Sequence, residues 1–155
     1  MPVVPEVAVI PPPSADTKPF ALTLHSKGEN YRIGERAQFM VESSQACYLT
    51  VVDIGASGNV AVLFPNTYQQ ANRILAGQKL RIPAPDQPFD IKVSGPAGKE
   101  RVVAICRLQD TPLFGTAYNF NQYPFRTLTP DWESGLSAVG VGQEVRAETS
   151  FMVRK

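Results

Sequence analysis

The stretch "ACYLTVVDIGASGNVAVLF" (residues 46–64) decides the fold of this chain. Residues 46–54 are apolar on both faces of an extended chain, as in a strand at the centre of a sheet. Residues 55–59, "GASGN", are typical of a tight turn. Residues 60–64 then return as a second apolar strand. The stretch therefore predicts a hairpin in the middle of a β-sheet.

Alternating apolar residues on either side of this hairpin predict further strands. Before it, the segments 19–26 and 35–43 carry an apolar residue at every second position, which is the period of a strand with one wet face. After it, strands are expected at 78–83, 88–94, 101–108 and 144–153, separated by turns rich in Gly and Pro. The side chains expected in the core are Phe39, Leu49, Val51, Val62, Phe64, Ile91, Val103 and Ile105.

Many short strands with little helical spacing favour an all-β fold, an antiparallel β-sandwich with an immunoglobulin-like arrangement. We expect about seven to nine strands. One or two short helices are expected, at residues 67–75 and 129–140.

The N-terminal stretch differs in composition from the rest. The first 20 residues hold six of the 14 prolines, and Pro resists both helices and central strands. We interpret residues 1–18 as a Pro-rich linker or tail, either a loose end or a tether to a membrane anchor or another domain. Residues 19–155 are expected to form one β-sandwich domain, with a long aromatic loop at about 108–130.

Composition and motifs limit the function classes. Fifteen basic and 14 acidic side chains leave a net charge of +1, which gives no reason to expect nucleic acid as a partner. No apolar run is long enough to insert into a membrane. The single histidine, His25, lies on the polar face of an expected strand, and Asp53 beside the Gly-rich turn is expected to bond its local backbone. We therefore expect no enzyme, no metal and no cofactor.

The two cysteines, Cys47 and Cys106, lie on expected central strands. A bridge between two sheets would close a long loop, which contributes about 4 kcal/mol in the entropic account. Free cysteine also packs as a small apolar residue. We favour two buried thiols, with the bridge as the alternative.

Two segments are candidates for binding. Phe64, Pro65 and Asn66 end an apolar strand, and we interpret them as a corner of the sandwich, with a ligand-binding loop as the alternative. Residues 114–132 combine Phe and Tyr residues with the only Trp. This aromatic segment is either cover for its own sandwich or a contact surface for a protein or peptide partner or a second copy of the domain. The expected contact residues are Tyr118, Phe120, Tyr123 and Trp132, with Arg126 at the polar rim.

Ordered motifs carry a family resemblance: "YRIGE" (31–35), "CYLTVVDI" (47–54), "GNVAVLFPN" (58–66), "NRILAG" (72–77) and "LRIP" (80–83). The chain resembles an uncharacterised bacterial family of domains of unknown function, marked by the "Leu-Phe-Pro-Asn" strand end. The resemblance covers about residues 20–110 and brings no catalytic residues. It implies an accessory module, appended to serine/threonine kinases, caspase-like peptidases and other envelope or signalling proteins.

Together these observations predict a non-catalytic binding or sensory module of a bacterial envelope protein. The alternative is a structural spacer that positions a catalytic neighbour. An extracytoplasmic (periplasmic) location is expected, and the cytoplasm is the alternative.

Overall fold

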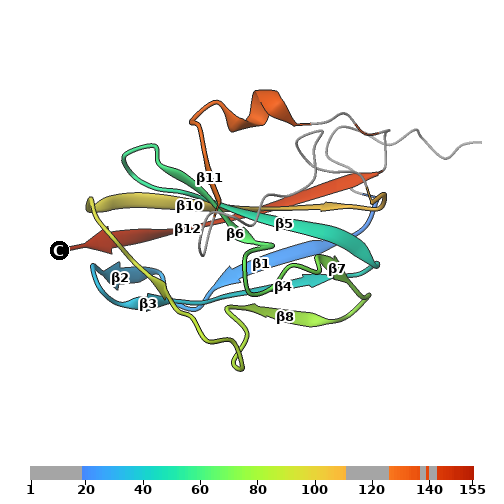
Figure 1. Cartoon of the computed structure of the whole chain (residues 1–155), viewed down its shortest axis with the longest axis horizontal. Coiled ribbons are helices and arrows are strands. Elements are labelled where there is room, and N and C mark those ends of the chain that lie inside the picture. Colours follow the sequence, from blue (N-terminus) through green and yellow to red (C-terminus); the bar gives the residue numbers. More distant parts are fainter. Residues whose placement is uncertain (1–18, 111–125, 137–138, 140–142) are drawn as a thin grey trace, which may run out of the picture.

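The computed structural model describes residues 19–110, 126–136, 139 and 143–155, and within them two main β-sheets face each other (Figure 1). The smaller sheet consists of three antiparallel strands in the order β1-β4-β8. These strands are β1 (Leu22–Ser26), β4 (Phe39–Ser43) and β8 (Lys79–Ile82). Their alternating burial agrees with the period-two pattern of the sequence.

The larger sheet is built around the predicted central hairpin. Its order is β11-β6-β5-β10-β12-β2, and the short β7 pairs with one end of β5. All its pairs are antiparallel except β12 with β2, which is parallel. A two-stranded pair, β3 with β9, completes the fold. The bounds are β2 (Asn30–Arg32), β3 (Arg36–Ala37), β5 (Cys47–Ile54), β6 (Val60–Phe64), β7 (Arg73–Ile74), β9 (Ile91–Lys92), β10 (Gly98–Arg107), β11 (Arg126–Leu128) and β12 (Glu144–Arg154).

The strand order is that of an immunoglobulin-like sandwich. In immunoglobulin letters, β12, β10, β5 and β6 follow the order G-F-C-C′, and β1, β4 and β8 follow A-B-E. The predicted all-β sandwich is therefore confirmed. The hairpin turn between β5 and β6 is also as predicted: Gly58 donates its N–H to Gly55 O (2.9 Å) and has φ +90°, a conformation that favours glycine.

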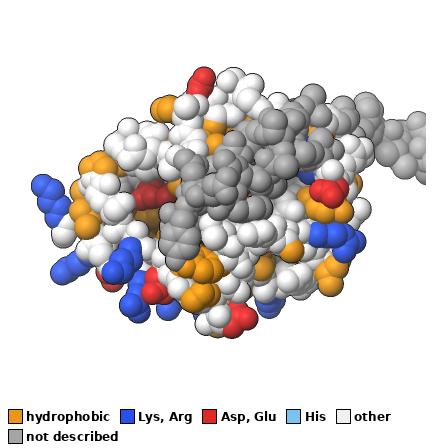
Figure 2. Space-filling model, in the orientation of Figure 1, with side chains coloured by type: hydrophobic (Ala, Val, Ile, Leu, Met, Phe, Trp, Pro, Cys, Tyr) orange, Lys and Arg blue, Asp and Glu red, His pale blue; other side chains and the backbone are white. Residues whose placement is uncertain are grey.

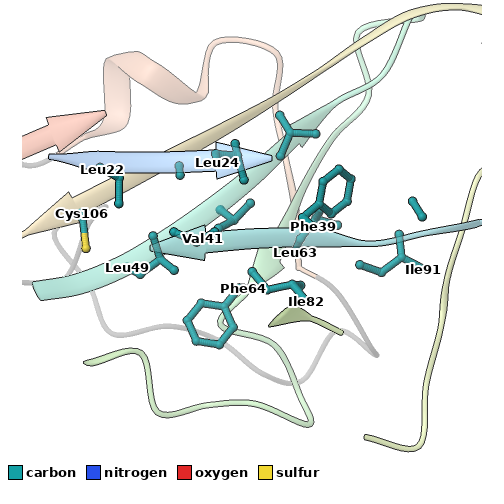
Figure 3. Close-up of a cluster of buried hydrophobic side chains, with 14 of the residues drawn as sticks. Leu22, Leu24, Phe39, Val41, Leu49, Leu63, Phe64, Ile82, Ile91 and Cys106 are labelled. Atoms are coloured by element: carbon teal, nitrogen blue, oxygen red, sulfur yellow. The ribbon is translucent and has the colours of Figure 1, made fainter. Parts of the chain in front are cut away.

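The core lies between the two sheets. Figure 3 shows Leu22 and Leu24 of β1 and Phe39 and Val41 of β4 close to side chains of the larger sheet such as Leu49. All eight residues that the sequence places in the core are buried. Burial of alternate positions from both sheets supplies the main stabilising free energy of such a sandwich.

The outer face of the larger sheet has a core of its own. Val52, Val103 and Ile105 point away from the sandwich interior and form a second cluster with Trp132. Trp132 opens the 3-10 helix η1 (Trp132–Gly135), which lies over this face of the sheet in Figure 1. The central strands are thus covered on both faces, which explains why β5 carries apolar residues on both of its faces.

The preference for two free thiols is wrong, because Cys47 and Cys106 form a disulfide. Their Cα atoms are 5.6 Å apart, within the range that a bridge requires. Cys106 lies opposite Leu49 in the register of β5 and β10, two positions from Cys47. The bridge therefore joins neighbouring strands of one sheet and does not cross between sheets.

Two expectations about secondary structure need correction. Residues 67–75 contain no helix: the chain turns at Asn66 and then adds β7 to the edge of β5. The Asn72 amide donates to Leu49 O (3.2 Å) and Leu49 N–H donates to Asn72 O (2.8 Å), which fixes this segment beside β5. The described residues also hold twelve strands instead of seven to nine, because strands of two or three residues are too short to show a period.

Candidate functional site

The corner at Phe64, Pro65 and Asn66 is organised around one buried amide. Asn66 is 1% exposed. Its Oδ1 accepts hydrogen bonds from the N–H groups of Tyr68 and Gln69, both at 2.9 Å. Its Nδ2 donates to Leu63 O at 2.7 Å, and its own N–H donates to Gln69 O at 2.9 Å.

These bonds show what the three corner residues do. Phe64 and Pro65 are buried with Asn66, and the Asn66 side chain is used within the turn. This geometry favours the corner over the ligand-loop interpretation for these three residues. The residues that follow, from Tyr68 onward, line a cavity. Their side chains contribute polar groups to it.

A second polar feature lies at the far end of β5. The Asp53 carboxyl is hydrogen-bonded to the Glu100 side chain at the start of β10. Burial, the hydrogen bond to Glu100 and the charge of Glu100, in that order, raise the pKa of Asp53 to about 9. Asp53 is therefore protonated at neutral pH and can donate to the Glu100 carboxylate. The expected bond from Asp53 to its local backbone is not what the structure records.

The Asp53–Glu100 pair lines a cavity of about 330 Å³. Other polar groups in its wall come from the β5–β6 turn, the segment before β10, and β11: Ser57, Asn59, Ser94 and Thr127. Oδ1 of Asp53 is buried and has no hydrogen-bond partner within the described part of the chain. A neutral acid beside a carboxylate can hold a proton, but among the described wall residues there is no Cys, His or Lys to act as nucleophile or base with it.

The structure describes only some of the predicted contact residues. Tyr118, Phe120 and Tyr123 lie outside the described residues, and Arg126 is described only through the backbone of β11. Trp132 is 6% exposed and packs against Val103 and Ile105 on the outer face of the larger sheet. For Trp132 this burial favours the alternative, cover for its own sandwich.

The charged surface is mixed. Figure 2 shows several Lys and Arg side chains at the end of the molecule where the C-terminus lies in Figure 1. Exposed Arg32 of β2 lies opposite exposed Arg154 of β12 in the parallel register. His25 is exposed on β1, as expected.

The described residues contain neither a metal-ligating cluster nor a membrane-spanning helix. Within residues 19–110 and the described parts of 126–155, His, Cys, Asp and Glu form no group of three or more that could hold a metal. No helix in the same part of the chain is long and apolar enough to span a membrane.

The fold and these sites define an immunoglobulin-like β-sandwich module with a disulfide in its larger sheet. A family model described as "Domain of unknown function (DUF4384)" matches residues 30–108. The chain belongs to this family. The matched region runs from β2 to β10, so it includes the disulfide, the Asn66 corner and the Asp53–Glu100 pair. A search of the curated proteins finds no match.

Proposed function

We propose that this chain is a non-catalytic binding or sensory module of a bacterial envelope protein that acts in signalling or secretion, and that it works outside the cytoplasm. The observation that carries the proposal is the Cys47–Cys106 disulfide. Structural disulfides persist in oxidising compartments such as the periplasm and are rare in the cytosol. The bridge lies between two central strands, with both cysteines at most 1% exposed, which is typical of a structural bridge and unlike an accessible redox pair.

The module acts beside a catalytic neighbour, such as a serine/threonine kinase or a caspase-like peptidase. This part of the proposal is supported by the family membership, with its lack of an assigned activity, and by the resemblance stated above. The partner is a protein or peptide, or a second copy of the domain. Tyr118, Phe120 and Tyr123 are proposed as anchors, because Tyr and Phe bury large areas at interfaces at low conformational cost.

The compartment is tested by trapping thiols in the bacterium that produces the protein. Cells are quenched with acid and the denatured protein is alkylated before any reduction. A module that works outside the cytoplasm carries no alkylated cysteine. Two alkylated cysteines in growing cells would contradict the proposed location.

The binding role is tested with Tyr118→Ala and Tyr123→Ala in the full-length protein. We expect weaker association with the partner, or weaker self-association, at an unchanged melting temperature. The second candidate, a structural spacer, is favoured by the burial of Trp132 as cover. A spacer predicts unchanged association in both variants, with activity of the neighbouring domain sensitive only to the length of the module.

A further inference from the structure

The segment that follows the Asn66 corner lines a cavity of about 300 Å³. Phe64 and Ile74, both 2% exposed, form part of its wall together with half-buried Leu80. This apolar base belongs to the main core, so it is held in place by the packing of both sheets. The volume is at the lower end of the range for small-molecule pockets.

An aromatic platform borders the cavity. The ring of Tyr68 stacks on the ring of Phe89, with centroids 5.0 Å apart and planes 11° from parallel. Phe89 packs against the core cluster, so it fixes the orientation of the Tyr68 ring. A held aromatic ring offers a flat surface to an apolar face of a ligand.

The polar wall is made of carboxamides. The described part of the cavity wall includes Gln69, Gln70, Gln78 and Gln87. Among these described wall residues there is no carboxylate, and Arg73 is the one charged side chain. Carboxamides both donate and accept hydrogen bonds. A wall of this kind suits a ligand whose own groups can do both.

Two of these amides have one side-chain end engaged by a bond within the chain, and a third has a buried oxygen without a partner in the described part of the chain. Gln70 donates its Nε2 to Thr67 O (3.2 Å), which leaves its oxygen as an acceptor. Gln78 accepts the Leu75 N–H at its Oε1 (3.0 Å), which leaves its NH₂ as a donor. Gln69 Oε1 is buried and has no partner within the described part of the chain. A buried acceptor without a partner costs free energy unless another group satisfies it.

We propose that this cavity binds an uncharged saccharide, one or two sugar rings in size. One face of a sugar ring lies against Tyr68, and hydroxyl groups donate to Gln69 and Gln70 and accept from Gln78. Hydroxyl groups meet this mixture of donors and acceptors because each can donate one hydrogen bond and accept two. The site goes beyond the proposed function, which rests on the aromatic segment and the disulfide, so either can fail without the other.

The test uses ¹⁵N-labelled protein titrated with cellobiose, maltose, lactose and N,N′-diacetylchitobiose at millimolar concentrations, followed by the side-chain NH₂ signals of glutamine. We expect at least one disaccharide to shift the signals of Gln69, Gln70 and Gln78 in a saturable way. The signal of exposed Gln109, which lies outside the cavity, is expected to stay in place.

The matched variants are Gln69→Met and Gln109→Met. Gln69→Met keeps the length of the side chain but removes the orphaned acceptor, so binding should weaken about tenfold, the equivalent of one hydrogen bond. Its melting temperature should not fall, because the side-chain oxygen has no partner to lose within the described part of the chain. Gln109→Met should bind as the wild type does.

Three results would overturn the proposal. The first is that none of the four disaccharides shifts the cavity signals. The second is that Gln69→Met folds and binds with unchanged affinity. The third is that triglycine, titrated in parallel, shifts these signals while every disaccharide fails, which would assign the cavity to a peptide.

Discussion

Asp53 and Glu100 share a hydrogen bond between two acidic side chains at one end of the larger sheet, and burial raises the pKa of Asp53 to about 9. In the unfolded chain the same carboxyl has its ordinary pKa of 3.8. Between these two values the folded state binds one proton more than the unfolded state. The free energy of unfolding should therefore fall as pH rises from about 4 to about 9, and this contribution should level off above pH 9.

Asp53→Asn should remove this pH dependence. The Asn side chain can still donate a hydrogen bond to Glu100, but it does not ionise in this pH range. We expect the variant to be as stable as the wild type near pH 4 and more stable near pH 8, measured by urea denaturation across the range. The control is Asp86→Asn, a change at an exposed turn, which should keep the wild-type profile. Parallel profiles for wild type and Asp53→Asn would contradict the assignment.

The disulfide should be complete and stabilising. Denatured, non-reduced protein should contain no free thiol, as measured with a thiol reagent. Cys47 and Cys106 close a loop with a sequence separation of 59. Replacing both with Ala should lower the free energy of unfolding by about 4 kcal/mol, because the unfolded chain regains the entropy that the closed loop had removed. The loss of buried sulfur atoms should lower it somewhat further.

A matched comparison separates the two contributions. Wild-type protein measured in reductant lacks the bridge, but its folded state keeps both sulfur atoms in the core. Its free energy of unfolding should therefore fall by less than that of the double variant. Equal stability of oxidised and reduced wild type would show that the bridge does not constrain the unfolded chain.

Trp132 should behave as a core residue. Its side chain covers Val103 and Ile105, so Trp132→Ala should cost about 3–5 kcal/mol in chemical denaturation. Trp132→Phe, which keeps most of the apolar cover, should cost much less. The exposed neighbour Glu133 provides the control, with Glu133→Ala near the wild type. Weakened association with unchanged stability in Trp132→Ala would restore Trp132 to the contact surface.

Local signals in the sequence predicted most of the fold. The central hairpin, the alternating strands and the core residues follow from side-chain periodicity within single strands, and such patterns are visible without knowledge of the partner strand. The short strands β2, β7 and β11 were not predicted, and β3 was predicted as one strand with β4, because two or three residues carry no period and are fixed by their neighbours in space.

The candidate sites depended on pairings that the sequence does not reveal. The Asp53–Glu100 contact and the Cys47–Cys106 bridge both result from the register of β5 and β10. Shifting that register by one residue would place each group on the opposite face. The role of Asn66 could be predicted, because an Asn after Pro at a strand end is a local turn signal.

The last prediction concerns the corner. Asn66→Ala removes two acceptor contacts and one donor contact of a buried side chain, leaving the N–H groups of Tyr68 and Gln69 and the carbonyl of Leu63 without that partner. Buried main-chain groups left unpaired cost about 1–3 kcal/mol each, and partial access of water to this turn reduces the sum. We expect Asn66→Ala to lose about 3 kcal/mol in urea denaturation. Asn72→Ala, which removes one side-chain bond to Leu49 O at a half-buried position, should lose about 1 kcal/mol. If the two variants lost equal amounts, the Asn66 amide would not be the group that organises the corner.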